Sequence, residues 1–475
     1  MITFTIALIV LVLGYVFYGK FIEKFFGADP NREVPSKSMA DGVDYIEMPT
    51  WKAYMIQFLN IAGLGPIFGA IMGAKFGTSS YLWIVFGTIF AGSVHDYFSG
   101  MISLRHGGQS LPQMVGHFLG SSFQRVFGVF SLVLLLLVTA VFVSQPADLL
   151  AKLTNGAIKV EIWVAIIFVY YLIATIFPVD KIIGRFYPIF GGVLLFMALG
   201  IMIAMFINRP DLPEMWHGFG TKYETHPIFP MMFISIACGA LSGFHATQSP
   251  LMARCLQNEK NGRFVFYGAM ISEGIVALVW AAAATAYFGE KGADFTAAEV
   301  VLAISKTWLG KLGGVLAVLG VVAAPITTGD TALRSARLIV ADAFNMKQRS
   351  IKNRLIVCVP LFVVTLLILL YSLTDAKGFA VIWRYFAWSN QTLAVFTLWA
   401  VTVYLTVRKK NVLITLIPAV FMSFVTTSYI MIAPEGLHLT PWIGYTVAAI
   451  ITLDFLAIYE RCRRHLQKGK VKIEE

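Results

Sequence analysis

The chain is dominated by a succession of apolar stretches, each about as long as a helix that crosses a lipid bilayer. A bilayer core about 30 Å thick needs roughly 20 consecutive apolar residues in an α-helix. The stretches number about thirteen, at 2–19, 52–75, 80–103, 126–150, 161–178, 186–207, 230–253, 264–289, 311–333, 355–373, 381–405, 411–432 and 441–460. A backbone in lipid must satisfy its own hydrogen bonds, which helices do. The pattern therefore predicts an all-α, polytopic membrane protein.

Composition and charge agree with this prediction. Hydrophobic residues make up 58% of the chain and charged residues only 13%, whereas soluble domains carry about 25% charged residues. The net charge of +11 is no sign of nucleic-acid binding, because the basic residues lie between the apolar stretches. We expect membrane lipid and a small-molecule substrate as partners, and no nucleic acid.

The distribution of Lys and Arg predicts the topology. With the N-terminus outside and the spans alternating, the inside segments hold 27 of the 37 Lys and Arg residues. Cytoplasmic loops retain these residues. We therefore expect an odd number of spans, an outside N-terminus and a cytoplasmic C-terminus.

Two of the spans are interrupted. The stretch "NIAGLGPIFGAIMGAKFG" (60–77) contains "GLGP" at 63–66, and the seventh span contains "CGALSGFHATQSP" at 238–250. Glycine and proline destabilise helix interiors, so we expect each span to break there. Broken spans at matching positions are typical of transporters built from inverted repeats.

Three pairs of landmarks support such a repeat. Their separations are 177 to 179 residues, for Gly65 with Gly243, Asp96 with Glu273, and Pro146 with Pro325. Five spans separate the members of each pair, so the repeats are inverted. The predicted parts are a leading helix and cytoplasmic loop (1–50), a first five-helix repeat (51–207), an extracytoplasmic loop (208–229), a second repeat (230–405), and two trailing helices with a basic tail (406–475).

The first interrupted span also carries a small-residue face. Gly65, Gly69, Gly73 and Gly77 recur every four residues, a spacing that allows close helix packing. The stretch is thus expected to act both as a hinge and as a packing seam.

Ionisable residues at membrane depth are functional candidates, because burying a charge in lipid is costly. Asp96 and Glu273 are candidate proton carriers, or else fixed polar ties between helices. Asp330 precedes Arg334 and Arg337 by four and seven residues, so it is either a coupling residue or part of a structural ion pair.

Uncharged polar residues complete the candidate sites. Thr327 and Thr328 could coordinate a coupling ion, or bond back to their own helix. The residues expected to contact substrate lie at or near the two breaks, with one further amide in the eleventh span: Asn60, Gly63, Gly65, Ser242, Gly243, His245, Gln248 and Asn390.

Enzyme motifs are missing from the sequence. It contains no GxxxxGK[ST] and no HExxH, and the spacing of its four cysteines predicts no disulfide framework and no zinc site. We expect no enzyme activity, no metal site and no cofactor beyond a coupling H+ or Na+. Two alternatives remain open: a passive channel, and a membrane enzyme with His95, Asp96, His106 and His245 as metal ligands.

Six stretches together resemble the carbon starvation protein A family of bacterial inner-membrane transporters. They are "NIAGLGPIFGAIMGAKFG" (60–77), "AGSVHDYFSGMISLRHGGQSLPQMV" (91–115), "SGFHATQSPLMARCL" (242–256), "RFVFYGAMISEGIVAL" (263–278), "TTGDTALRSARL" (327–338) and "FAWSNQTLAVFTL" (386–398). The resemblance implies a leucine-transporter-like core. It also implies nutrient uptake during carbon starvation, by peptide transport or by proton-coupled pyruvate symport.

Together, these observations predict a secondary active transporter. It would import a small carboxylate-bearing nutrient by cation-coupled symport, with H+ favoured over Na+. The resemblance places Asn60, Gly63 and Gly65 on the first broken helix, and Ser242, Gly243 and His245 on the second.

Overall fold

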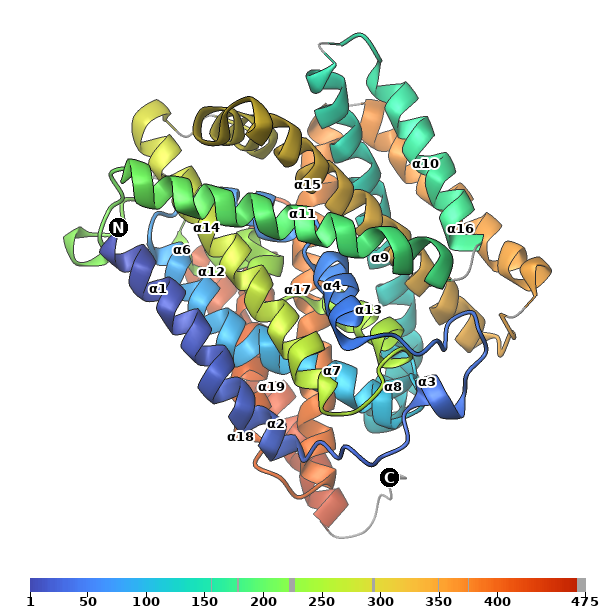
Figure 1. Ribbon diagram of the computed structural model, residues 1–475. Helices are drawn as coiled ribbons and strands as arrows, with labels where there is room; N and C mark the ends of the chain where they lie inside the picture. The colour runs from blue at the N-terminus through green and yellow to red at the C-terminus, as the bar shows by residue number, and fades with distance from the viewer. Residues whose placement is uncertain are drawn as a thin grey trace.

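The computed structural model describes residues 1–154, 156–176, 179–221, 227–292, 295–348, 350–374 and 376–467. Every regular element in this part of the chain is a helix (Figure 1). The predicted all-α class is therefore confirmed.

The first half of the chain forms the elements up to α11. They are α1 (Ile2–Leu13), η1 (Gly14–Gly19), α2 (Lys20–Phe26), α3 (Pro35–Ser38), α4 (Thr50–Ile61), η2 (Gly65–Gly69), α5 (Ala70–Ala74), α6 (Ser79–Leu82), η3 (Trp83–Gly92), α7 (Ser93–Arg105), α8 (Leu111–Leu119), α9 (Ser121–Leu153), α10 (Val160–Ile176) and α11 (Val179–Asn208).

The second half begins after the short helix η4 (Met215–His217). It comprises α12 (Ile228–Ile236), η5 (Ala237–Gly239), α13 (Gly243–Ala253), η6 (Arg263–Gly268), α14 (Ala269–Lys291), α15 (Ala297–Ala343), α16 (Ile351–Thr374), α17 (Ala376–Val407), α18 (Leu413–Ile432) and α19 (Pro441–Gln467).

Each of the predicted spans coincides with helix. Among the described residues, nine helices are long and apolar enough to cross a membrane, and a bent pair, Thr50–Ile61 with Gly65–Ala74, makes a tenth. The other three predicted spans fall on the helical run from α6 to α7, on α10 and on α15. The run from α6 to α7 carries His95 and Asp96, which lower its hydropathy.

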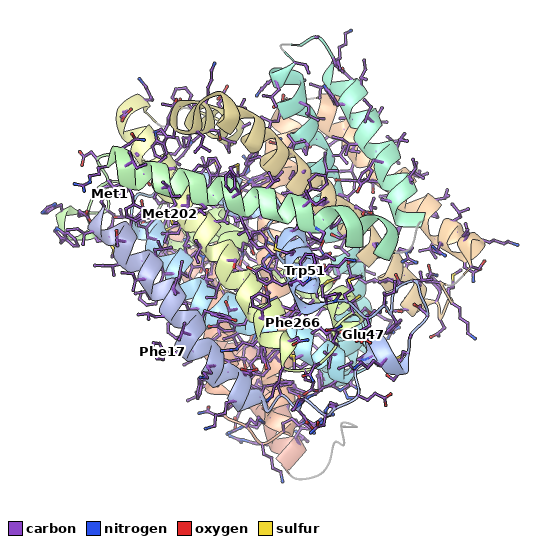
Figure 2. The ribbon with its side chains drawn as sticks, in the orientation of Figure 1. Met1, Phe17, Glu47, Trp51, Met202 and Phe266 are labelled. Atoms are coloured by element: carbon purple, nitrogen blue, oxygen red, sulfur yellow. The ribbon has the colours of Figure 1, made fainter. Side chains whose placement is uncertain are left out.

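Apolar side chains cover much of the outer surface of the bundle. Phe17 is 69% exposed and points away from the helices (Figure 2). Other large apolar side chains that are more than half exposed include Val126, Val129, Ile162, Val169, Ile189, Ile207, Leu367, Ile417, Leu453 and Ile458. Such a surface requires an apolar solvent, so the protein is a multi-pass membrane protein.

Contacts between the connecting segments support the alternation of spans. On the side predicted to be cytoplasmic, Arg105 bonds Glu259 at 2.9 Å and Arg263 pairs with Glu23 at 3.0 Å. On the opposite side, the Thr78 amide donates to the Phe219 carbonyl at 2.8 Å. Segments assigned to the same side are thus in contact, as alternating spans predict.

The first break lies slightly earlier than predicted. Helix α4 ends at Ile61, residues 62–64 are non-helical, and Gly65 and Pro66 begin η2. The predicted break at 63–66 was therefore wrong at its C-terminal end. Proline is compatible with the first turn of a helix, where its missing N–H is not needed.

The second break is shorter than the predicted 238–250. The chain departs from regular α-helix at 237–242, and α13 then runs from Gly243 to Ala253 with Pro250 inside it. Ser242 is extended at the start of α13, with φ −147° and ψ 122°. His245 and Gln248 therefore lie on a helix that follows the break.

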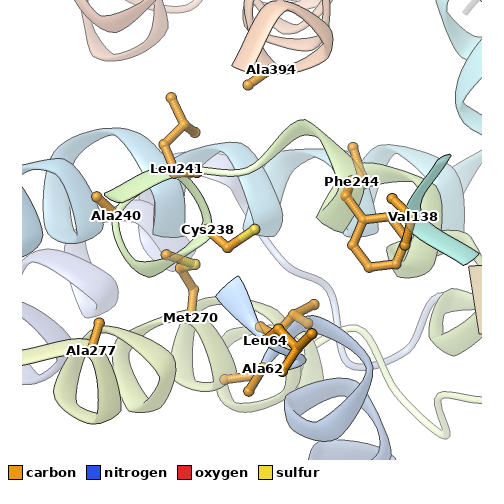
Figure 3. Close-up of a cluster of buried hydrophobic side chains, with 14 of the residues drawn as sticks. Ala62, Leu64, Val138, Cys238, Ala240, Leu241, Phe244, Met270, Ala277 and Ala394 are labelled. Atoms are coloured by element: carbon orange, nitrogen blue, oxygen red, sulfur yellow. The ribbon is translucent and has the colours of Figure 1, made fainter. Parts of the chain in front are cut away.

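The two breaks pack directly against each other. A Cβ on Gly65 would lie 2.2 Å from Cβ of Cys238, and one on Gly69 would lie 2.7 Å from the carbonyl oxygen of Ile236. Gly73 faces the Ile236 side chain. Figure 3 shows Cys238 near Leu64 in this core. The predicted glycine seam thus exists, and its partner is the other broken helix.

Gly77 does not belong to that seam. It has a φ of +68°, and a Cβ on it would lie 1.8 Å from the Phe219 carbonyl oxygen. Gly77 therefore makes a turn after α5, which corrects the expectation that all four glycines share one face.

Replacing Gly69 by alanine tests the seam. We expect Gly69→Ala to destabilise the protein by about 1–3 kcal/mol, because its Cβ meets backbone that cannot move aside easily. Gly289 in α14 is the matched control, since a Cβ there meets nothing within 4 Å. Thermal unfolding of the purified protein in detergent measures the difference. A Gly69→Ala variant that unfolds at or above the Gly289→Ala temperature would contradict the seam.

Candidate functional site

The second break is held by two amide side chains of α17. The side-chain oxygen of Asn390 accepts hydrogen bonds from Ser242 Oγ at 3.0 Å and from the Phe244 amide at 2.7 Å. Gln391 donates to the Leu241 carbonyl at 2.7 Å. Backbone groups freed by the break are thereby satisfied away from water. Asn390, which the sequence predicts as a substrate contact, thus helps to hold helices together at this break.

Asp96 lies at the centre of a fully buried group of ionisable side chains. Its Oδ1 bonds Nδ1 of His95 at 2.8 Å, and its Oδ2 bonds Nδ1 of His245 at 2.9 Å. Asp96 and His95 belong to α7, whereas His245 belongs to α13, directly after the second break. The hydrogen bond from His245 therefore ties a broken helix to α7.

Glu273 of α14 lies on the other side of the same imidazole. Its Oε2 is 3.4 Å from Nε2 of His245, and both side chains are fully buried. Within the described structure, neither carboxylate oxygen of Glu273 has a hydrogen-bond partner. The two acids with matching positions in the predicted repeats thus meet at one histidine.

The two acids differ in their hydrogen-bond partners. Asp96 accepts from two ring nitrogens, so its negative charge is stabilised. When Nδ1 of His245 carries the ring proton, Nε2 is a hydrogen-bond acceptor. A protonated Glu273 can then act as the hydrogen-bond donor to Nε2. An uncompensated carboxylate at Glu273 would be costly in this interior. The arrangement Glu273–His245–Asp96 can therefore hold a proton and pass it along.

Amide groups without hydrogen-bond partners lie near the first break. Both polar side-chain atoms of Gln57 and of Asn60 are buried and unpaired in the described structure, as is Oε1 of Gln248. Helix α4, which carries Gln57 and Asn60, packs against α13 and α15. Buried polar groups are normally satisfied, so these amides are suited to bind a polar ligand.

The two threonines of α15 have different surroundings. The Thr327 hydroxyl donates within its own helix, to Ala323 and Ala324. The Thr328 hydroxyl also bonds back to its own helix, at 2.9 Å from the Ala324 carbonyl, but it lies 3.0 Å from the Leu59 carbonyl near the end of α4 as well, and Gly63 packs against it. Only Thr328 thus faces the first break.

Asp330 has a partner that the sequence did not suggest. Tyr187 of α11 donates its hydroxyl to Oδ2 of Asp330 at 2.5 Å. Arg337, which was considered as a partner for Asp330, lies 3.3 Å from Asp44, and Arg334 lies 3.9 Å from the same carboxylate. Asp44 is in the loop between α2 and α4, so no helical spacing could have found it.

The open alternative of a metal enzyme gains no support from the described residues. His106 bonds the Ile102 carbonyl and stacks near His117, apart from the group at Asp96. No cluster of three or more His, Cys, Asp or Glu residues with a metal-binding arrangement occurs in the described parts.

Solved structures share this fold at low sequence identity. A manganese transporter of Eremococcus coleocola superposes with a TM-score of 0.55 at 13% identity, covering 91% of this chain and 99% of that one. The transporter MhsT, in complex with L-phenylalanine, has a TM-score of 0.55 at 12% identity, covering 85% and 98%. The chain therefore has the leucine-transporter-like fold of these proteins.

Curated relatives include transporters. An uncharacterized membrane protein of Haemophilus influenzae is 44% identical over 61% of this chain and 91% of its own length. The peptide transporter CstA of Campylobacter jejuni is 30% identical over 58% of this chain, and the pyruvate/proton symporter BtsT of Escherichia coli is 27% identical over 58%. The chain matches about half the length of these two transporters, 48% of each.

The family model for carbon starvation protein CstA matches residues 1–162, 145–307 and 295–429. These matches cover most of the chain and include both breaks, Asp96, Glu273 and the threonines of α15. The family and the named relatives are membrane transporters rather than enzymes. The chain belongs to the carbon starvation protein CstA family and is a transporter.

Proposed function

We propose that this protein is a secondary active symporter of the bacterial inner membrane. It imports a small carboxylate-bearing nutrient, a peptide or pyruvate, together with protons, and it serves nutrient uptake during carbon starvation. Its N-terminus lies outside and its C-terminus in the cytoplasm. The relatives' names supply the two substrate classes, and the positive loops supply the orientation.

The observation that carries the proposal is the buried chain of Glu273, His245 and Asp96 beside a broken helix. His245 lies 2.9 Å from Asp96 and 3.4 Å from Glu273. A rocking motion of α13 changes these two distances, so protonation and helix position are linked. Substrate that binds at the breaks would thereby be coupled to the proton.

The substrate would bind beside the two breaks, where α4 packs against α13. Asn60, together with Gln57, offers unpaired amide groups on one side, and Gln248 offers an unpaired oxygen on the other. The half-helix N-terminus at Gly243 carries a partial positive charge that favours a carboxylate. Ser242 and Asn390 hold this N-terminus in place, and Gly63 and Gly65 allow the backbone to approach.

Glu273→Gln tests the role of the proton. We expect this variant to retain counterflow exchange of labelled substrate in proteoliposomes, because glutamine resembles the protonated acid. Its accumulation of substrate driven by a pH gradient should fall at least about fivefold, the lower end of typical coupling strengths. Asp96→Asn should lose accumulation as well, since it removes the charge that His245 faces.

Asp148→Asn is the matched control for these variants. Asp148 is a membrane-end carboxylate of α9, partly exposed and paired with Lys152 at 3.0 Å, so its loss should leave accumulation unchanged. Full accumulation by both Glu273→Gln and Asp96→Asn would rule out this group as the coupling site. If the unaltered protein never raises the substrate concentration inside the vesicles above that outside, the protein is a channel.

Sodium coupling is the second candidate, favoured by the contact between Thr328 and Leu59. A threonine hydroxyl and a freed backbone carbonyl are the ligands that bind sodium in other transporters with broken helices. Asp330 lies two residues beyond Thr328 and is bonded to Tyr187.

Paired threonine variants separate the two ions. We expect uptake to follow the pH gradient and to be unaffected when K+ replaces Na+, in the unaltered protein and in Thr327→Val. If uptake instead requires Na+, and Thr328→Val loses that dependence whereas Thr327→Val keeps it, sodium is the coupling ion.

A further inference from the structure

The loop between α2 and α4 lies across one end of the bundle, the end predicted to face the cytoplasm (Figure 1). It is fastened to the segment that follows α13. Ser36 donates to the Leu256 carbonyl at 2.6 Å, and the Met48 amide donates to the Cys255 carbonyl at 3.0 Å. Tyr45 donates to the Gly107 carbonyl, after α7, at 2.9 Å. The loop is therefore attached to α7 and α13, which carry Asp96 and His245.

Asp44 joins this loop to a different part of the bundle. Its Oδ1 lies 3.3 Å from Arg337 and 3.9 Å from Arg334, both on α15 and both fully buried. Burial would raise the pKa of Asp44, but the guanidinium groups of Arg337, Arg334, Arg254 and Arg354 offset this effect and hold the pKa below its usual value. Asp44 is thus the anion of a buried arginine cluster.

Four arginines, Arg254, Arg334, Arg337 and Arg354, surround Asp44 and form the arginine cluster. Its four guanidinium groups are at most 5% exposed. Arg337 bonds Gln348 at 3.0 Å, yet its Nε is buried without a hydrogen-bond partner in the described structure. Two further carboxylates of the described structure act on this cluster: Asp342 on Arg254 and Arg337, and Asp330 on Arg334 and Arg337. Guanidinium groups arranged in this way are suited to bind carboxylates.

A polar seam connects the cluster with the centre of the protein. Gln248 donates to Ser335 Oγ at 3.2 Å, and Ser335 donates to the Thr247 carbonyl at 3.1 Å. These residues lie between His245 and Arg254 on α13, and beside Arg334 on α15. A substrate that leaves the breaks along this seam would reach the arginine cluster.

We propose that the arginine cluster is a carboxylate-binding site on the inner exit path, and that Asp44 fills it as a tethered substitute for the substrate's carboxylate. While Asp44 is bound, the loop joins α13 to α15 and keeps the inner end closed. Departure of Asp44 frees the arginines for the leaving substrate. The inference rests on the proposed function for the direction and the substrate class.

Rescue of Asp44→Ala by acetate tests the site. Asp44→Ala leaves buried guanidinium groups without their anion, which is strongly destabilising. We expect thermal stability of the purified variant to fall, and acetate to restore it in a saturable manner. Chloride at equal ionic strength should not restore it. Glu47, exposed on the same loop (Figure 2), is the control: Glu47→Ala should be stable and insensitive to acetate.

Native Cys255 supplies a second measurement that does not depend on stability. Its thiol is buried beneath the loop, 3.8 Å from the Asp44 carbonyl, and is not part of a disulfide in the described structure. The alkylated residue is identified by peptide mapping. We expect alkylation to become at least about tenfold faster in Asp44→Asn. A tenfold change in how often the loop opens corresponds to only ~1.4 kcal/mol, and breaking a buried ion pair costs more than that. Acetate should slow the alkylation again, whereas Glu47→Gln should match the unaltered protein.

The outcomes separate this inference from the proposed function. Carboxylate transport by the unaltered protein, with no acetate-specific rescue of Asp44→Ala, would overturn the exit site alone. Equal effects of acetate and chloride would also overturn it. If acetate rescues Asp44→Ala but the unaltered protein transports no carboxylate, the carboxylate-binding site stands. The proposed substrate class is then overturned.

Discussion

The contact between the two helix breaks is the constraint on which the rest of the structure depends. Gly65 lies against Cys238, and Gly69 lies against the Ile236 carbonyl, at distances that no side chain could tolerate. Asn390 and Gln391 satisfy backbone and side-chain groups at and after the second break. Non-helical backbone at membrane depth is stable only where protein surrounds it in this way. These contacts fix the direction of α13, and α13 in turn places His245.

His245 then brings together two acids that belong to separate helices. Asp96 has two imidazole partners, whereas Glu273 has no hydrogen-bond donor in the described structure. In the proposed function, this difference gives the group one fixed charge and one place for a mobile proton. The loop carrying Asp44 connects the segment after α13 with α15. In the proposals made above, α13 therefore links the proton site with the inner closure.

Much of this architecture follows from local patterns in the sequence. Hydropathy predicts the spans, glycine and proline predict the two breaks, and the matching offset of Asp96 and Glu273 predicts that they act as a pair. The break boundaries differ because Pro66 fits the first turn of η2 and Pro250 is accommodated inside α13. Contacts between residues far apart in the chain are inaccessible to such reasoning. Asp44 and Arg337 are 293 residues apart, and Tyr187 and Asp330 are 143 apart.

The central claim is that a proton travels with the substrate through the group at His245. The most direct test records the pH inside proteoliposomes with a trapped dye while an inward substrate gradient is imposed, in the absence of sodium and with the membrane potential clamped. The proposal predicts acidification of the interior that depends on substrate and is lost in Glu273→Gln. Substrate entry without acidification in the unaltered protein, or undiminished acidification in Glu273→Gln, would contradict it.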